Sequence, residues 1–353
     1  MKTLVAMSGG VDSSVAAWMI KTAYGRDNVW GVHMLLNEDL ESCDLKSRSC
    51  CGTQDAEDAR KVAQHLGIMF DAIPMYDAFQ QAVVDNFVSE YAAGRTPIPC
   101  THCNGVLKFN LLLKYADVAG YDRIATGHYV GQDLDGRLWR AQATEKDQSY
   151  YLWQIKAEAL SRLVFPIGAL SGKEECRKLA IHAGLEISQK PDSQNICFVP
   201  AGDYRKVLES KRPDLFTSRQ GKIVVDGKVV GEHEGYWGYT IGQRVRLPGL
   251  SERLYVIGVV AATNTIITSP NPQATLTSSF AIQDPNWHDG KEFHKGEYWI
   301  KTSAHAEPVA ATLLGARVFT KTPVKAAPGQ ACVFYRPGSQ NKGFKLEGGA
   351  WIR

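Results

Sequence analysis

The chain has 353 residues, of which 44% are hydrophobic and 22% charged, and its formal net charge is +3. This length supports two or three domains, and the composition is that of a globular protein with a buried core. No apolar run approaches the roughly 18 residues that a membrane span needs, and the stretch MKTLVAMSGG lacks the pattern of a signal peptide. Eight cysteines without a secretory segment favour thiol chemistry or metal binding over a disulfide scaffold, and therefore a cytoplasmic protein with no membrane partner.

The charge is divided unevenly along the chain. Residues 1–202 carry 20 Lys and Arg against 24 Asp and Glu, whereas residues 203–353 carry 20 against 13, a net charge of +7. A basic C-terminal part favours a polyanionic partner, although a solvated basic face would give the same count.

The N-terminal part alternates β-rich runs with helical patterns. Strands are predicted at residues 2–7, 28–36, 68–75 and 123–130, and helices at residues 12–23, 54–67, 76–93 and 104–119. This alternation predicts an α/β fold with a doubly wound, mostly parallel sheet, whose ligand sites lie at the carboxyl ends of the strands.

After about residue 202 the pattern changes to short β runs separated by glycine and polar turns. We therefore expect two β-rich domains after the α/β domain. The predicted boundaries are residues 1–202 for the α/β domain, 203–270 for a small central domain, and 271–353 for a C-terminal barrel-like domain.

The stretch AMSGGVDSS, Ala6–Ser14, connects the first predicted strand to the first helix. Gly9 and Gly10 permit a sharp turn and a close approach of the backbone to a ligand. The serines supply hydroxyl groups, and the helix start supplies N–H groups and a positive dipole end. Capping alone requires neither two glycines nor three serines. The stretch therefore predicts a phosphate-binding loop, distinct from both the Walker and the GxGxxG loops.

Cys100 and Cys103 stand two residues apart where a helix is predicted to begin. This spacing fits half of a zinc site, a redox pair, or a catalytic thiol with a neighbour. The sequence shows no second CxxC and no nearby His pair to complete a zinc site. Apart from Cys197, the remaining cysteines are expected to lie in a surface loop or to pack in the core: Cys43, Cys50, Cys51, Cys176 and Cys332.

The motif SGGVDSS after an N-terminal strand resembles the signature of the ATP pyrophosphatases, or PP-loop family, which cleave ATP between the α- and β-phosphates. Further blocks follow in the order found in the tRNA-specific 2-thiouridylases of that family: GRTPIPCTHCN, ATGHY, KDQSYYL, FPIGALSGKEECR, KPDSQNICF, GEHEGYWGYTIGQR and APGQACVFY. The resemblance covers nearly the whole chain. It implies an adenine nucleotide α-hydrolase-like fold and ATP-dependent 2-thiolation of the wobble uridine of tRNA, with AMP and pyrophosphate as products.

The resemblance also implies the residues of the nucleotide site. ATP and Mg²⁺ are the expected cofactors, and Asp12 would help to hold the metal near the phosphates. The implied ATP-binding residues are Ala6, Met7, Ser8, Gly9, Gly10, Val11, Asp12, Ser13, Met34 and Gly127.

Cys103 and Cys197 match the two active cysteines of the family. Cys197 would carry a persulfide received from a sulfur-carrier protein, and Cys103 would attack it or shuttle protons, so that each turnover ends with a Cys103–Cys197 disulfide. A helix start beside Cys103 is expected to favour its thiolate. The implied tRNA contacts are Ile98, Pro99, Cys100, His128, Lys146, Asp147, Gln148 and Gln330. At the Cys100 position many relatives have Asp, and at the Ile98 position Asn is common. Residues 300–308 also depart from the family pattern, so no contact is transferred there.

Three alternatives remain open at the level of sequence. One is an iron–sulfur cluster held by Cys100, Cys103 and Cys197, with one iron open to hydrosulfide. Another is a PP-loop ligase acting on a small substrate, which would have no use for Cys103 and Cys197. The third is a non-catalytic tRNA-binding or sulfur-carrier protein, which would release no pyrophosphate.

Overall fold

The computed structural model describes residues 1–36, 53–192, 196–199, 202–217, 220–249, 252–292, 294–338 and 343–353. Cys43, Cys50 and Cys51 lie outside the described residues, and their predicted place in a surface loop stays a prediction.

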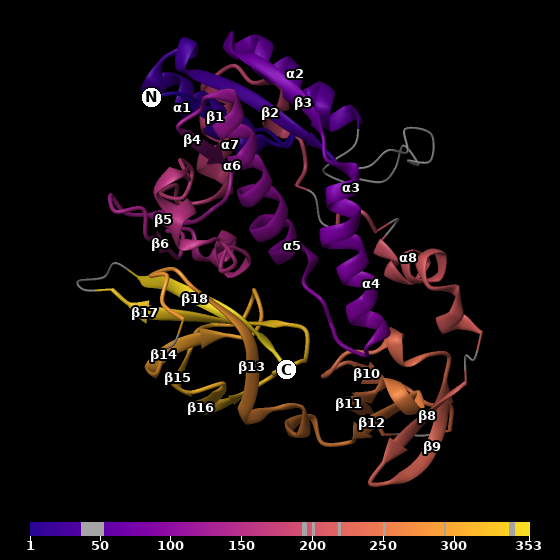
Figure 1. The fold of residues 1–353 in the computed structure, drawn as a ribbon. Helices are drawn as coiled ribbons and strands as arrows, with labels where there is room; N and C mark the ends of the chain where they lie inside the picture. The colour runs from indigo at the N-terminus through magenta and orange to yellow at the C-terminus, as the bar shows by residue number, and fades with distance from the viewer. Residues whose placement is uncertain are drawn as a thin grey trace.

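A parallel sheet forms the centre of the N-terminal part, with strand order β3-β2-β1-β4-β7 (Figure 1). Every neighbouring pair in it is parallel. The order reverses between β1 and β4, and in open α/β sheets ligands bind at such a point, outside the carboxyl ends of the strands. The strands are β1 (Thr3–Ala6), β2 (Val29–Leu35), β3 (Met69–Pro74), β4 (Arg123–Thr126) and β7 (Leu163–Val164).

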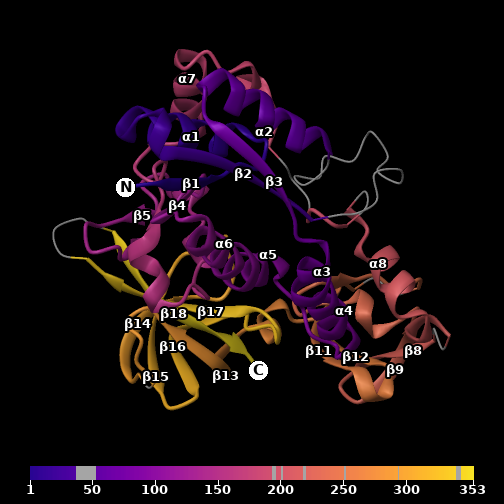
Figure 2. The same cartoon turned by 45° about the horizontal axis from the view of Figure 1, so that its top comes forward.

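Helices cover both faces of this sheet, as the doubly wound prediction requires (Figure 2). One face carries α1 (Val11–Tyr24), α2 (Thr53–Leu66) and α7 (Lys173–His182), which bury residues such as Val15, Ala63 and Cys176. The other face carries α3 (Tyr76–Phe79), the π-helical segment η2 (Gln80–Val84), and a continuous helix made of α5 (Pro99–His102), π-helical η3 (Cys103–Leu111) and α6 (Leu112–Ala119).

The predicted strand at residues 123–130 is wrong at its C-terminal end, because β4 stops at Thr126. A Cβ atom on Gly127 would lie 2.6 Å from the backbone nitrogen of Ser13. The chain therefore passes directly over the start of α1 and leaves the sheet there. This exit places the residues after Gly127 at the carboxyl edge of the sheet.

A second sheet follows, with strand order β10-β11-β12-β8-β9. Its core contains Ile223, Val256 and Ile266. Helix α4 (Asp85–Ala92) continues α3 and η2 away from the first sheet and packs with α8 (Tyr204–Lys211) through Phe87 and Leu208. The strands are β8 (Gly221–Val225), β9 (Lys228–His233), β10 (Arg244–Val245), β11 (Leu254–Val260) and β12 (Thr265–Ser269).

The C-terminal sheet closes into a barrel, since β13 pairs with both β16 and β18. Between them the strand order is β13-β16-β15-β14-β17-β18, and the hairpin of β5 and β6 from the N-terminal part adds to β18 through Trp139 and Lys345. The strands are β13 (Thr277–Trp287), β14 (Gly296–Lys301), β15 (Val309–Leu314), β16 (Arg317–Val324), β17 (Ala331–Pro337), β18 (Phe344–Ile352), β5 (Gly131–Gln132) and β6 (Leu138–Trp139).

Side-chain hydrogen bonds join this barrel to the N-terminal part. Asn286 Nδ2 of β13 donates to the carbonyl oxygens of Trp153 and Ile155, at 2.7 and 2.9 Å.

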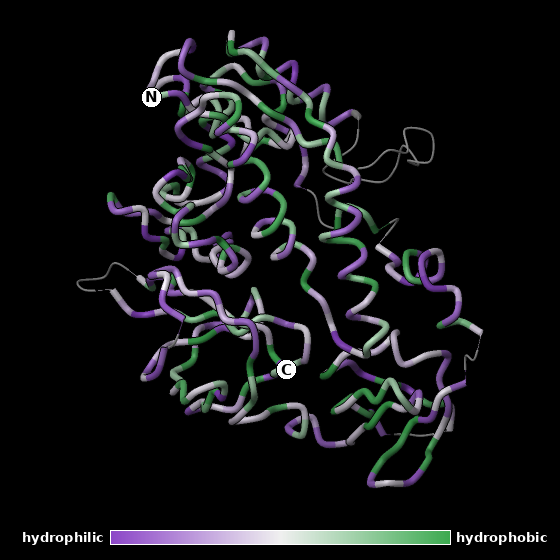
Figure 3. The backbone as a smooth tube through the Cα atoms, viewed as in Figure 1, coloured by the Kyte–Doolittle hydropathy of each residue, from purple (hydrophilic) through white to green (hydrophobic). Residues whose placement is uncertain are grey.

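Hydrophilic and hydrophobic residues alternate over short distances along the chain (Figure 3). Within the described ranges, no helix combines the length and the apolar character that crossing a bilayer would take.

Candidate active site

The predicted phosphate loop lies at the carboxyl end of β1, beside the point where the strand order reverses. Gly9 has φ +76°, and a Cβ atom there would overlap the carbonyl oxygen of Asp55. The Ser13 hydroxyl accepts the N–H of Ser8 at 3.0 Å and donates to the Gly10 carbonyl at 3.1 Å. The serines therefore hold the turn in shape, while the first backbone amides of α1 remain available for an anion.

Asp12, in the first turn of α1, is surrounded by groups from distant parts of the chain. Tyr129, which follows β4, donates its hydroxyl to Oδ1 at 3.0 Å. Lys173, at the start of α7, lies 2.9 and 2.8 Å from the two carboxylate oxygens. The thiol of Cys176 donates to Oδ1 at 3.3 Å. Burial, followed by the charge of Asp12, raises the pKa of this thiol to about 12, which leaves it protonated and unreactive.

Two lysines place positive charge beside the loop. Burial lowers the pKa of Lys173, but the carboxylates of Asp12 and Asp192, the latter 2.6 Å away, raise it by more. Lys190 donates to the Gly9 carbonyl at 2.9 Å and pairs with Asp55 at 2.6 Å. Both lysines are therefore charged and stand where a polyphosphate would need cations.

Sequence reasoning assigned no role to either lysine or to Tyr129. Each of the three lies inside a block already singled out, FPIGALSGKEECR, KPDSQNICF or ATGHY. The sequence could have indicated these three residues only as a lysine or tyrosine next to a turn in a motif block. The parallel sheet and its crossovers supply the proximity to the loop that the sequence does not show.

The residues expected on the nucleoside side lie around the ends of β1 and β2. Ala6 ends β1 and pairs with Val32 and Thr126 on the two neighbouring strands. Met34 is half-buried near the end of β2. His33 beside it is buried, its Nδ1 lies 2.8 Å from the Met7 carbonyl, and its Nε2 has no partner among the described residues.

The two cysteines of the CxxC lie one turn apart on the helix that begins at Pro99. Cys100 is exposed, whereas Cys103 is buried in the main hydrophobic cluster. The sequence predicted the helix start beside Cys103, but the helix begins at Pro99. The free backbone amides of its first turn therefore lie beside Cys100, and Cys103 lies in the second turn. Asn104 Nδ2 donates to the carbonyl of Tyr151 at 3.3 Å. Burial, followed by the charge of Cys100, raises the pKa of Tyr151. Tyr151 of the KDQSYYL block therefore lies beside the CxxC, near Cys100 and hydrogen-bonded to Asn104.

Cys197 is half-buried and packs against the same hydrophobic cluster that contains Cys103. The next residue, Phe198, makes edge contacts with Phe79 of α3 and Phe87 of α4, at ring distances of 5.6 and 5.1 Å. Cys103 and Cys197 therefore both lie at the main hydrophobic cluster, which extends from Leu4 of β1 to Leu346 of the barrel. Within the described ranges, no three Cys, His, Asp or Glu side chains are grouped as a metal site requires. Cys100, Cys103 and Cys197 therefore do not form such a group in this structure.

Lys146, Asp147 and Gln148 of the KDQSYYL block lie in three different environments, of which Lys146 and Gln148 are the two near the phosphate site. Lys146 Nζ lies 3.4 Å from Asp192, at the edge of the phosphate site. Gln148 exchanges two hydrogen bonds of 2.8 Å with the backbone of Tyr129, and so holds the tyrosine that donates to Asp12.

Asp147 is buried, with 1% of its side chain exposed. It accepts hydrogen bonds from Arg140 Nε at 3.1 Å, from the Ala141 N–H at 3.0 Å and from the Ser149 hydroxyl at 2.9 Å. Lys301 of the barrel approaches it to 3.9 Å. A tRNA contact by Asp147 stays a prediction, and it would require this network to open.

His128 and Gln330 make contacts within the protein. His128 Nδ1 lies 2.8 Å from the Thr126 hydroxyl, and burial, followed by the charge of Lys108, lowers the pKa of His128 to about 3. Gln330 of the barrel donates to the Thr96 carbonyl at 2.9 Å, just before Ile98 and Pro99, which are buried at the start of α5. The predicted tRNA contacts thus fall into a group near the phosphate site and a group near the start of α5.

Comparison with known proteins identifies the family. The family model described as the tRNA methyl transferase HUP domain matches residues 1–201, and the one described as the tRNA methyl transferase PRC-barrel domain matches residues 213–270. A solved NH3-dependent NAD synthetase from Campylobacter jejuni is 18% identical with a TM-score of 0.33, over 61% of this chain and 76% of that chain.

Curated relatives match over almost the full length. The tRNA-specific 2-thiouridylase MnmA of Rhodospirillum rubrum is 41% identical, with 99% of this chain and 96% of that protein covered. The protein of the same name from Zymomonas mobilis is 40% identical, with 100% and 93% covered. With this identity over this length, the chain belongs to the tRNA-specific 2-thiouridylase family.

Proposed function

We propose that this protein catalyses ATP-dependent 2-thiolation of the wobble uridine of tRNA. The observation that carries the proposal is that one fold holds both a lysine-flanked phosphate loop and two cysteines, Cys103 and Cys197, at a common hydrophobic cluster. A small-substrate ligase would use the loop but not the thiols.

The residues around the loop suit the triphosphate of ATP. The glycine turn brings backbone amides to the phosphates, and Lys173 and Lys190 offset their charge. Mg²⁺ would add further neutralisation, since this ion is usually held by substrate phosphates and one or two carboxylates. Asp12 and Asp192, which share Lys173, would be the carboxylates that hold it.

The first chemical step makes the uridine oxygen a leaving group. The C2 oxygen attacks the α-phosphorus of ATP, the bond to the β-phosphate oxygen breaks, and pyrophosphate leaves with negative charge. The lysines stabilise that charge where it develops. The product is a uridine adenylated on its C2 oxygen.

The second step delivers sulfur. A carrier protein transfers a sulfane sulfur to Cys197, which becomes a persulfide. In one route the Cys103 thiolate attacks the inner sulfur of this persulfide and releases hydrosulfide, which adds to C2 and expels AMP. In the other route the terminal sulfur attacks C2 directly and expels AMP, and the Cys103 thiolate then attacks the Cys197 sulfur, which breaks the S–S bond and releases the thiolated base. Both routes leave a Cys103–Cys197 disulfide, which a thiol reductant must reduce.

The partners follow from this chemistry. We propose tRNA as the substrate, a persulfide carrier protein as the sulfur donor, and the cytoplasm as the location of the reaction. The central domain (residues 203–270) and the C-terminal domain (residues 271–353) would clasp the anticodon stem, consistent with their net charge of +7. Lys146, Gln148 and Gln330 are proposed to contact the tRNA.

The test is anaerobic purification followed by iron and sulfide analysis, with thiolation of an unmodified tRNA transcript measured on the same sample. Cluster-free protein should thiolate with a persulfide donor. Cys103→Ser and Cys197→Ser should abolish thiolation while ATP and tRNA binding persist, and Cys332→Ala, in the barrel core, should retain it. Thiolation only when iron and sulfide are bound would replace the persulfide scheme with a cluster at Cys100, Cys103 and Cys197. Unchanged thiolation in Cys197→Ser would defeat the scheme as well.

A further inference from the structure

His33 of β2 is a buried titratable residue to which the proposed chemistry gives no part. Only 1% of it is exposed, and its Nδ1 lies 2.8 Å from the carbonyl oxygen of Met7. A carbonyl oxygen only accepts hydrogen bonds, so Nδ1 carries the hydrogen and donates it. Burial lowers the pKa of His33, which keeps the ring neutral near pH 7. The neutral ring then carries no hydrogen on Nε2, which has no partner among the described residues.

The bond from His33 fixes the peptide group through which β1 enters the phosphate loop. The Met7 N–H donates to the Val32 carbonyl at 2.8 Å and so continues the pairing of β1 with β2. The carbonyl of Met7 and the N–H of Ser8 belong to one planar peptide group. His33 holds the oxygen of this group, and the Ser13 hydroxyl accepts its N–H at 3.0 Å. Rotation of the group would break both hydrogen bonds at once.

The protein holds two further carbonyl oxygens of the loop in the same way. Lys190 donates to the Gly9 carbonyl at 2.9 Å. The hydroxyls of Ser13 and Ser14 donate to the Gly10 carbonyl at 3.1 and 2.9 Å. A carbonyl oxygen repels a phosphate, whereas successive backbone N–H groups attract it. Groups that hold the oxygens therefore help to keep the other loop amides turned toward an anion.

His33 and Lys190 lie close together against the loop. Burial has the largest effect on the pKa of His33, after which the Met7 bond and the charge of Asp55 raise it and the charge of Lys190 lowers it. Lys190 pairs with Asp55 at 2.6 Å, and a Cβ atom on Gly9 would overlap the Asp55 carbonyl. His33, Asp55 and Lys190 therefore form one group packed against the loop.

We propose that His33 is a positioning residue of the nucleotide site. Its imidazole donates from Nδ1 to the Met7 carbonyl and thereby sets the peptide group before the loop, so that the loop amides face the phosphates of ATP. An apolar ring of the same shape would leave the Met7 carbonyl buried without a partner. This inference rests on the proposed function, which supplies ATP as the ligand.

The experiment measures the ATP dissociation constant of three His33 variants by calorimetric titration with Mg²⁺ and without tRNA. His33→Phe keeps a ring and removes the donor. It should raise the dissociation constant by about 5- to 100-fold, the range for a buried carbonyl left without its partner.

Two amide variants separate the hydrogen bond from the packing of the ring. Asn carries its amide nitrogen on Cγ, as His carries Nδ1, whereas Gln carries it one atom further from the backbone. His33→Asn should therefore stay within about threefold of the wild-type dissociation constant, because the donor to Met7 is retained. His33→Gln should weaken ATP binding as His33→Phe does. This contrast does not depend on whether His33→Phe folds.

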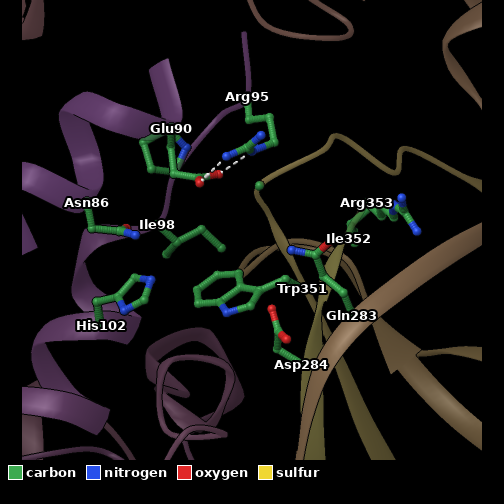
Figure 4. A pocket seen from close by; sticks show the side chains of 12 residues that line it. Asn86, Glu90, Arg95, Ile98, His102, Gln283, Asp284, Trp351, Ile352 and Arg353 are labelled. Carbon is green, nitrogen blue, oxygen red and sulfur yellow. Dashed lines mark hydrogen bonds and ion pairs between the residues drawn. The ribbon is translucent and has the colours of Figure 1, made fainter. Parts of the chain in front are cut away.

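The matched control is His233→Phe. His233 is 6% exposed, lies in β9 of the second sheet, and also bonds to the backbone through Nδ1, which accepts the Gly235 N–H at 3.1 Å. A second control is His102→Phe. His102 stacks on Trp351 in a pocket of about 360 Å³ between α5 and the barrel (Figure 4), and no residue that lines this pocket belongs to the phosphate loop. Both controls should keep the wild-type ATP affinity.

The position of the ring hydrogen gives a direct readout. NMR of protein with isotope-labelled histidine should show His33 with its hydrogen on Nδ1 at pH 7, and the signal is assigned by its loss in His33→Asn. A hydrogen on Nε2 with none on Nδ1 would overturn the assignment, because such a ring cannot donate to Met7.

The titrations separate the inference from the function on which it rests. Wild-type ATP affinity in His33→Phe would overturn the positioning role. An equal loss of affinity in His33→Asn and His33→Gln would overturn it as well, because the ring would then act through packing alone. Absence of tRNA thiolation by wild-type protein that binds ATP would defeat the proposed function and leave the role of His33 in the loop standing.

Discussion

Lys173 Nζ makes hydrogen bonds to both carboxylate oxygens of Asp12, from a position 161 residues further along the chain. The pair joins the first turn of α1 to the first turn of α7, and Lys173 also binds Asp192. A half-buried lysine with two carboxylates stays charged, and it can exchange a carboxylate for a phosphate oxygen without leaving its place. We therefore assign it a part in holding the polyphosphate.

Lys173→Met should lower the rate of tRNA-dependent pyrophosphate release by about 100- to 1,000-fold, the usual cost of removing a group that stabilises developing charge. Lys178→Met is the control, since Lys178 lies on the same helix with 72% of its side chain exposed. Steady-state pyrophosphate assays at saturating tRNA would measure both. Equal rates in the two variants would contradict the assignment.

Gly9→Ala should abolish ATP binding, because the new Cβ atom overlaps the Asp55 carbonyl and the loop must move. Gly25→Ala provides the matched control. Gly25 also has a positive φ, of +78°, but a Cβ atom there has open space around it. Gly25→Ala should cost about 1–3 kcal/mol of unfolding free energy, because its φ of 78° with ψ of 151° is a conformation that only glycine adopts readily, and it should leave ATP affinity unchanged. Calorimetric titration with ATP and chemical denaturation would check both variants, and wild-type ATP affinity in Gly9→Ala would refute the close-packed loop.

Asp147→Ala should destabilise the protein by about 3–5 kcal/mol, because it leaves the Arg140 guanidinium, 8% exposed, beside an empty position. Lys146→Ala, at a half-exposed neighbour, should have little effect on stability. Denaturation in urea would measure the stabilities, and filter binding would measure tRNA affinity. A loss of tRNA affinity in Asp147→Ala at unchanged stability would instead identify Asp147 as a direct contact.

The free energy of unfolding should fall as the pH drops from about 6.5 to about 4. Burial lowers the pKa of His288 to about 4, from 6.5, while its ring stays within 3.2 Å of the Trp153 carbonyl. The unfolded chain takes up the proton first, so the stability is fully present above pH 6.5 and is lost on the way down to the folded pKa, by up to about 3 kcal/mol.

His288→Asn should flatten part of this acid loss, and His305→Asn, at an exposed histidine, should not. His128, with its pKa lowered to about 3, contributes in the same direction and remains in both variants. Unfolding curves collected between pH 4 and 8 would reveal the difference. Identical acid profiles for His288→Asn and the wild-type protein would contradict the burial of a neutral His288.

Local sequence was sufficient for several features. The stretch AMSGGVDSS predicted where the glycine turn between β1 and α1 lies, because a glycine pair between a strand and a helix is a local signal. The serine hydroxyls, which were expected to face a ligand, include that of Ser13, which bonds within the turn to Ser8 and Gly10. Alternating strands and helices likewise predicted the parallel sheet with helices on both faces, because period and element length are properties of short segments. The domain boundaries at 202 and 270 stay predictions.

Tertiary structure decided what surrounds the loop. Lys173 and Lys190 reach Asp12 and Gly9 only because parallel strands deliver their carboxyl ends, and the segments that follow, to one edge of the sheet. The same holds for Asp147, which the sequence placed on a tRNA-binding turn and the fold buries against Lys301 of the barrel. Trp351 meets His102 because the barrel closes on itself and its last strand ends beside α5. Contacts between residues so far apart depend on how whole elements pack, and no window of the sequence encodes that packing by itself.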